Sequence, residues 1–114
     1  MSFDIQEAGR RIVEEIPKIP QTQRAVFAVG ILRELDQPAK EKCGDKVRVE
    51  FAKMAKGHER DSCLVPFMLA LVQAGAVEKA KEFVALLSDS SLSESFLQGL
   101  GDELAGRLTQ ALGF

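Results

Sequence analysis

One histidine and two cysteines are the most reactive side chains in this sequence, and their spacing does not form a catalytic or metal site. His58 lies in a charged turn, where exposure to solvent is the usual outcome. Cys43 and Cys63 have no second pair, so they fit neither a zinc site nor a disulfide framework. A nucleophilic triad would need His58 beside one thiol, together with an orienting acid. We therefore expect buried, reduced thiols and no metal.

Carboxylates and glycines also lack the spacing that chemistry requires. Glu14 and Glu15 are adjacent on an expected helix, where neighbouring side chains point about 100° apart and do not share a proton. Gly99 and Gly101 have neither a strand before them nor a lysine after them, as a phosphate-binding loop requires. The sequence therefore predicts no catalytic residue, no cofactor and a non-enzymatic protein.

Basic residues are concentrated at positions 40–60, although the whole chain has a net charge of −2. The candidates for contacting phosphates are Lys46, Arg48, Lys53, Lys56 and Arg60. Acidic residues such as Asp45 and Glu50 are interleaved with them, which is typical of a salt-bridged, exposed helix. A nucleic-acid-associated regulatory protein is therefore the alternative function, and the acidic chain as a whole disfavours it.

The N-terminus has no basic region followed by an apolar one, and no apolar run approaches the length of a membrane span. These features predict a soluble, cytoplasmic protein without a membrane partner. The chain has 114 residues, which is the usual size of one domain, so we expect a single domain over 1–114.

The apolar stretch at residues 64–87 organises the rest of the chain. Residues 64–72 are apolar without interruption, so we expect a helix that is buried on all sides. Gly75 can adopt positive φ and start a tight return into a half-buried helix that ends near residue 87. Residues 25–32 form another uninterrupted apolar run. We expect these two runs to pack as the central pair.

The remaining helices are expected at residues 4–16, 23–35, 38–56 and 92–112. The expected N-terminal caps are Asp4, Thr22, Asp61 or Ser62, and Ser91 paired with Glu94. Pro66 is expected in the first turn of its helix, where a missing N–H costs little.

Residues 38–56 fit two patterns. Cys43, Val47 and Phe51 form a stripe at helical spacing, whereas Val47, Val49 and Phe51 alternate with charges as in a strand. We choose helix over strand for 44–52 because a lone strand would have no partner for its backbone. Gly44 and Asp45 are expected to divide this segment into a short turn and a longer helix.

Short loops then place sequential helices side by side and antiparallel. The sequence therefore predicts an all-α domain of five or six antiparallel helices in three hairpins, as an irregular helical repeat or bundle.

Two resemblances follow from these residues. The set Phe67, Met68, Leu71, Gly75, Ala80 and Val84 resembles one helix pair of the tetratricopeptide type in its spacing. The C-terminal half is similar to small type III secretion needle-subunit chaperones: a proline precedes a buried helix, a glycine turn and a second helix follow, and the last helix contains residues 96–100. The second resemblance implies a chaperone-like protein that holds an aggregation-prone helical partner in a groove.

The last expected helix has glycines at positions 99, 106 and 113, which share one helical face. Each interior glycine costs a helix about 1 kcal/mol relative to alanine. We expect this cost to be offset because a glycine face allows another backbone to approach closely. The candidate partner-binding residues are Phe96, Gly99, Leu100 and Gly106. The hypothesis is an adaptor module that presents a groove to a helix or peptide, with a protein partner or a second copy of the chain as the ligand.

Overall fold

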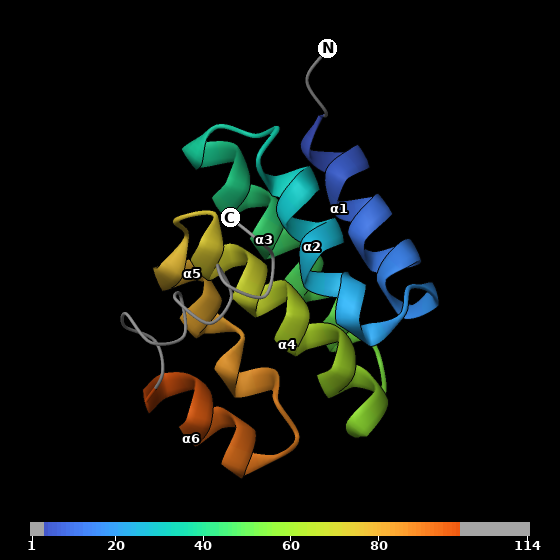
Figure 1. Cartoon of the computed structure of the whole chain (residues 1–114), viewed down its shortest axis with the longest axis vertical. Coiled ribbons are helices and arrows are strands. Elements are labelled where there is room, and N and C mark those ends of the chain that lie inside the picture. The colour runs from blue at the N-terminus through green and yellow to red at the C-terminus, as the bar shows by residue number, and fades with distance from the viewer. Residues whose placement is uncertain (1–3, 99–114) are drawn as a thin grey trace.

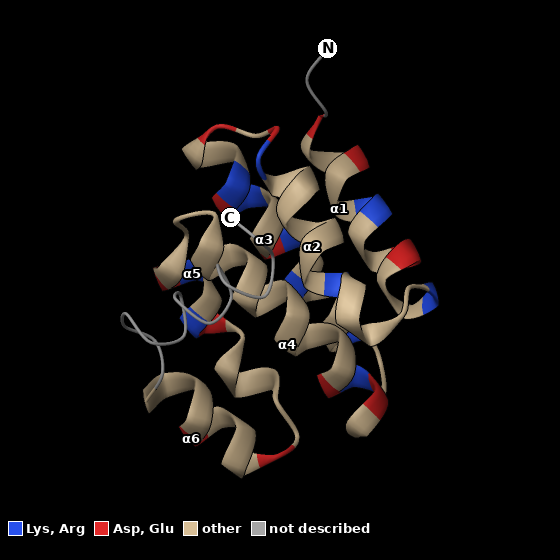
Figure 2. Ribbon diagram, viewed as in Figure 1, with Lys and Arg blue, Asp and Glu red and all other residues tan. Residues whose placement is uncertain are grey.

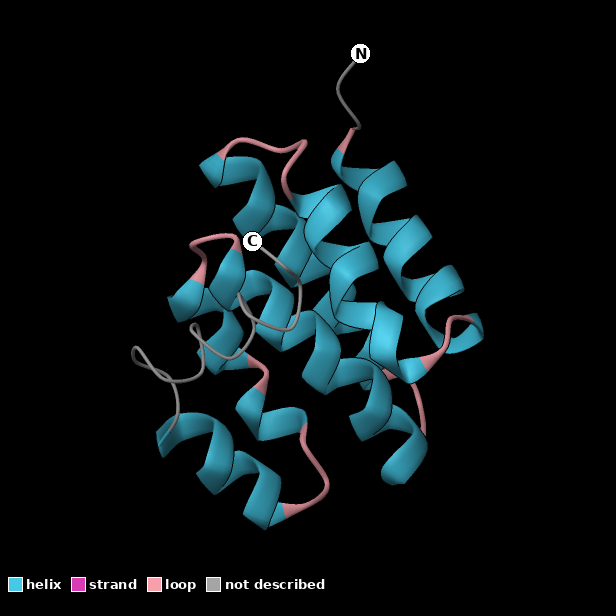
Figure 3. Ribbon diagram, viewed as in Figure 1, coloured by secondary structure: helices cyan, strands magenta, loops and turns pink. Residues whose placement is uncertain are grey.

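The computed structural model describes residues 4–98, which form six α-helices and two short 3₁₀ helices (Figure 1). In chain order these are α1 (Ile5–Glu15), η1 (Ile16–Lys18), α2 (Gln21–Leu32), α3 (Gln37–Ala52), α4 (His58–Gln73), α5 (Val77–Glu82), η2 (Val84–Leu86) and α6 (Ser90–Gln98). The described residues contain no strand (Figure 3). The all-α prediction is confirmed, and residues 44–52 are helical. No helix in the described range is long and apolar enough to cross a membrane.

The first four helices pack mainly with alternate rather than sequential neighbours, whereas α5 packs mainly against α4. α2 makes its most extensive contact with α4, and α1 makes its own with α3. Sequential helices run in opposite directions, so the helices of each packed pair run in the same direction (Figure 1). The predicted central pair is confirmed, and so is the hairpin of α4 and α5 around Gly75, but the three-hairpin arrangement does not hold for α1 with α2 or for α3 with α4, whose main contacts are with other helices. A short loop fixes only the ends of two helices, whereas burial of their apolar faces decides which helices pack.

One continuous core lies between these helices. Its largest fully buried side chains are Ile12, Ile16, Val29, Leu32, Val47, Phe51, Leu64, Phe67, Met68, Leu71 and Phe83. α2 is not buried on all sides, because Val26 is 45% exposed and a Cβ added to Gly30 would meet no atom within 4 Å. An uninterrupted apolar run therefore overstates the burial of this helix.

The turn between α4 and α5 forms as expected. Gly75 has φ +90°. Its N–H donates to Val72 O at 3.1 Å, and the N–H of Ala76 donates to Leu71 O at 2.8 Å. This pattern closes the C-terminus of α4 in the way that a left-handed glycine permits. Across the turn, the rings of Phe67 and Phe83 pack with their centroids 5.4 Å apart.

α3 is one helix, and Gly44 does not break it. Gly44 is buried beneath the side chain of Lys79 from α5, and an added Cβ would lie only 2.6 Å from Lys79 Cγ. Because the Lys79 side chain passes over Gly44, its Nζ lies 2.7 Å from Asp45 Oδ1 and 2.9 Å from Glu82 Oε2. Gly44 is therefore a close-packing position between α3 and α5.

The predicted caps are confirmed at α1 only. Asp4 Oδ1 accepts hydrogen bonds from the N–H groups of Gln6 and Glu7. Thr22 lies inside α2, whose cap residue is Pro20 and has no capping side chain. At α6, Asp89 Oδ1 accepts from Ser91 N at 2.9 Å, so Asp89 takes the role predicted for Ser91.

α4 begins at His58, earlier than predicted, and Gly57 precedes it as the cap residue with φ +150°. The Ser62 hydroxyl donates to Glu59 O at 2.7 Å from within the helix. Asp61 accepts hydrogen bonds from another loop, so neither residue caps this helix.

Candidate functional site: a cavity between α2, α4 and α6

Pro66 lies in the interior of α4 and not in its first turn as predicted. Proline has no N–H, so it cannot donate to the carbonyl four residues earlier, which belongs to Ser62. An interior proline normally costs a helix about 3 kcal/mol, largely through this loss and a clash of its ring. The position therefore calls for a donor from outside the helix.

Arg24 of α2 supplies that donor. Its Nη1 donates to Ser62 O at 3.0 Å and lies 3.1 Å from the Ser62 hydroxyl oxygen. Its Nε donates to Ile19 O at 2.8 Å, in the loop before α2. One guanidinium thus joins this loop to the carbonyl that Pro66 leaves free. These bonds fix the start of α2 beside the first half of α4.

A cavity of about 240 Å³ opens at this point and extends to α6. Its lining residues are Gln21, His58, Asp61, Ser62, Val65, Pro66 and Leu92. A second cavity of about 440 Å³ adjoins it and is lined by His58, Asp61, Ser88, Asp89, Ser90 and Leu92. Val65, Pro66 and Leu92 give the first cavity an apolar wall, and serine and carboxylate groups make the second more polar. We call the two together the α4–α6 groove.

Two charged residues fix the loop that forms one edge of the groove. Asp61 is 3% exposed, and its two oxygens accept from Ser88 N at 2.9 Å and Asp89 N at 3.2 Å. Arg60 is 4% exposed and donates to the carbonyl oxygens of Met54 and Leu86. Both side chains therefore bind backbone groups of neighbouring segments. They hold the start of α6 against the start of α4.

The predicted partner site falls largely outside the described residues. Gly99, Leu100 and Gly106 lie beyond residue 98, and nothing is described there. Phe96 is 5% exposed and belongs to the core. On the same helix, Leu92 is 37% and Leu97 is 51% exposed, so α6 presents leucines to solvent and anchors itself through Phe96.

The basic residues predicted for nucleic acid differ in their exposure and in their partners. Arg60 is buried, as described above. Arg48 lies 3.5 Å from Asp45, and Lys53 lies 3.2 Å from Glu50, as expected for a salt-bridged helix. Lys46 lies with its aliphatic stem over Gly9 of α1, where an added Cβ would be 2.9 Å from Lys46 Cδ. Lys56 is exposed beyond the end of α3.

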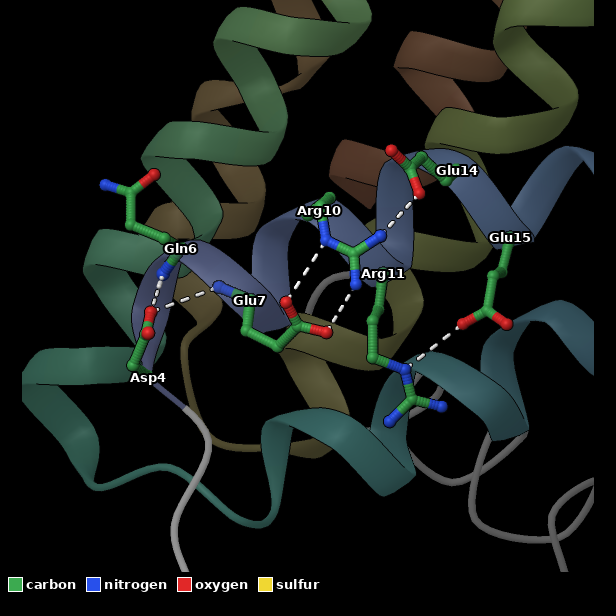
Figure 4. Close-up of polar contacts among 7 residues, drawn as sticks. All are labelled: Asp4, Gln6, Glu7, Arg10, Arg11, Glu14 and Glu15. Carbon is green, nitrogen blue, oxygen red and sulfur yellow. Dashed lines mark hydrogen bonds and ion pairs between the residues drawn. The ribbon is translucent and has the colours of Figure 1, made fainter.

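Adjacent carboxylates of α1 bind different arginines (Figure 4). Glu14 Oε2 lies 2.7 Å from Arg10 Nη1, and Glu15 Oε2 lies 3.2 Å from Arg11 Nε. Arg10 also pairs with Glu7, and this hydrogen bond lowers the pKa of Glu7. Glu14 and Glu15 therefore share no proton site, as predicted, and the network is a solvent-exposed set of ion pairs.

Both thiols are free and buried, as predicted. Burial raises the pKa of Cys43 to about 11. Burial also raises the pKa of Cys63, although Arg24 acts in the opposite direction. A thiol is a nucleophile only as the thiolate, so neither group is activated at neutral pH. Over residues 4–98, no group of three or more His, Cys, Asp or Glu side chains is placed to hold a metal ion.

Comparison of the chain with protein-family models, with curated proteins and with solved structures gave no match. The groove residues Val65, Pro66 and Leu92 were not predicted as a site. Their one sequence signal is Pro66 within an apolar helix, because an interior proline implies an external donor and an altered surface nearby. The partner of that proline, Arg24, is too distant in sequence to be identified by spacing.

Proposed function

We propose that this protein is an interaction module of the adaptor or chaperone-like type, and that the α4–α6 groove receives an apolar side chain from a helix or peptide of a protein partner. The observation that carries this proposal is the apolar cavity lined by Val65, Pro66 and Leu92. Recognition of helices and peptides commonly uses such a cavity, with polar groups at its edge. Gln21, His58 and Ser62 supply those polar groups here.

The division of the groove supports a protein ligand. The adjoining polar cavity measures about 440 Å³, whereas the apolar cavity alone measures about 240 Å³, which is below the range of about 300–1,000 Å³ that is typical of small-molecule and cofactor sites. A cavity of this size suits one or two inserted side chains. Leu92 is on the rim and 37% exposed, so its own burial against a ligand would add apolar area to the complex.

Selection from a random peptide display library tests this proposal. The full chain is immobilised, and the selected peptides are then measured against Leu92→Asp and against Val49→Asp. Val49 is 52% exposed on α3 and lines neither cavity, so it is the matched control.

We expect Leu92→Asp to weaken binding at least about tenfold, which corresponds to about 1.4 kcal/mol, and Val49→Asp to leave it unchanged. Circular dichroism establishes that both variants remain folded. Failure to select any peptide, or equal loss of binding in both variants, would contradict the proposed function.

A further inference from the structure

Asp61 is a buried carboxylate that forms no ion pair with a Lys or Arg of the described residues. Its oxygens accept one backbone N–H each, although a carboxylate has about four acceptor positions. Buried charges in proteins are usually paired, because removing a charge from water is costly. Asp61 is among the residues that line both cavities of the α4–α6 groove, so its carboxylate lies close to whatever occupies them.

The α4 and α6 edges of the groove are acidic as well. Segments 58–62 and 88–95 contain Glu59, Asp61, Asp89 and Glu94, and their one basic residue is Arg60. On the α2 side Arg24 borders the groove at Ser62, and its guanidinium donates to the carbonyl oxygens of Ser62 and Ile19. Arg60 is buried, and its guanidinium is bound to two backbone carbonyls, so it does not neutralise the surface. Figure 2 shows acidic segments at the start of α4 and at the start of α6. Hydrogen bonds from Ser91 lower the pKa of Asp89, which keeps this carboxylate charged at neutral pH.

We infer that the partner segment is cationic: it places an apolar side chain in the cavity beside Val65 and Leu92, and a Lys or Arg about one helical turn away in the adjoining cavity beside Asp61 and Asp89. This inference rests on the proposed function. The apolar and acidic halves of the groove share His58, Asp61 and Leu92, so one short segment can contact both. Charge complementarity of this kind sets the orientation and the choice of partner.

The display selection described above supplies the first part of the test. We expect the selected peptides to have Lys or Arg at a fixed spacing from an apolar residue. Selection of Leu92-dependent peptides with no preference for a basic residue would overturn this inference and leave the proposed function intact.

The second part uses one selected peptide and its analogue with Gln in place of the basic residue. We expect the analogue to bind about tenfold more weakly to the full chain, and added salt to reduce this difference. Asp89→Asn should abolish most of the difference, because it removes the charge but retains an oxygen that can accept from Ser91 N. Glu78→Gln is the control, because it removes one charge from an exposed site on α5 that lines neither cavity.

Equal affinity of the peptide and its analogue would overturn the cationic partner. An undiminished difference in Asp89→Asn would overturn it also, since the basic residue would then act elsewhere. If binding does not depend on Leu92 at all, the proposed function fails and the inference fails with it.

Discussion

Replacement of Arg24 with Met removes the guanidinium and retains a side chain of similar length. The hydrogen bonds from Nη1 to Ser62 O, at 3.0 Å, and from Nε to Ile19 O, at 2.8 Å, are lost together. Ser62 O cannot find a helical partner in compensation, because residue 66 is a proline. Two partly buried carbonyl groups therefore lose their donors in a single substitution.

The magnitude follows from the chemistry of these bonds. A hydrogen bond from a charged donor contributes about 1.5–3 kcal/mol, and partial exposure of this guanidinium favours the lower value for each. We expect Arg24→Met to lower the free energy of unfolding by about 2–3 kcal/mol. For a chain of this length, that corresponds to a fall in Tm of about 10 °C.

Pro66→Ala provides the second half of a double-mutant cycle. Alanine at position 66 restores an N–H that can donate to Ser62 O, so this carbonyl no longer depends on Arg24. The cost of Arg24→Met should then fall by about 1 kcal/mol in the Pro66→Ala background. The chain contains no Trp and no Tyr, so far-UV circular dichroism during urea and thermal unfolding is the suitable measurement.

Equal costs of Arg24→Met in the unsubstituted chain and in the Pro66→Ala background would refute the assignment of Arg24 as the substitute donor. Arg10→Met is the control for general loss of a positive charge. Arg10 is 51% exposed, and within residues 4–98 its ion pairs are with carboxylates of its own helix, so its replacement should leave Tm nearly unchanged.

Three further results are expected. Gly44→Ala should destabilise the fold by about 1–3 kcal/mol, because the added Cβ displaces Lys79. Gly30→Ala should stabilise the fold by about 0.5–1 kcal/mol, because its Cβ enters open space; thermal unfolding of the two variants measures both effects. Asp45→Asn should lower Tm at neutral pH. The hydrogen bond from Lys79 lowers the pKa of Asp45, so this difference should be constant above the unfolded-state value of 3.8 and disappear as pH falls through the folded-state pKa; unfolding scans across acidic pH would show it. Both cysteine thiols should be unreactive toward a disulfide reagent in the folded chain at neutral pH and should react in denaturant; a fast reaction of the folded chain would contradict their burial.

Local patterns in the sequence predict the elements and much of the core. The helical stripe of Cys43, Val47 and Phe51 is buried, and Gly75 forms the turn for which positive φ is needed. These features depend on residues within one or two helical turns, so spacing and residue type are sufficient to identify them. The central packing of α2 against α4 follows equally from their long apolar runs.

Features that depend on distant residues are predicted poorly. The sequence favours a helix start for Pro66 because an interior proline lacks a donor, and only the folded chain brings Arg24 to Ser62. The sequence favours a helix break at Gly44, because glycine is a poor helix former. The reason for a glycine at this position is Lys79 of α5, which lies over it and is too distant in sequence to be identified from spacing. The same limit applies to the groove, whose walls come from α2, α4 and α6 and have no common pattern in the sequence.

The packing of alternate helices also determines when the protein can bury its core during synthesis. α2 ends at Leu32, but its main partner, α4, ends at Gln73. Ribosomes add about 5–20 residues per second, so the 41 residues from Arg33 to Gln73 require about 2–8 s. Throughout that interval the apolar face of α2 has no α4 to pack against. We therefore expect the emerging N-terminal half to be more prone to aggregation than the complete chain until α4 has been synthesised.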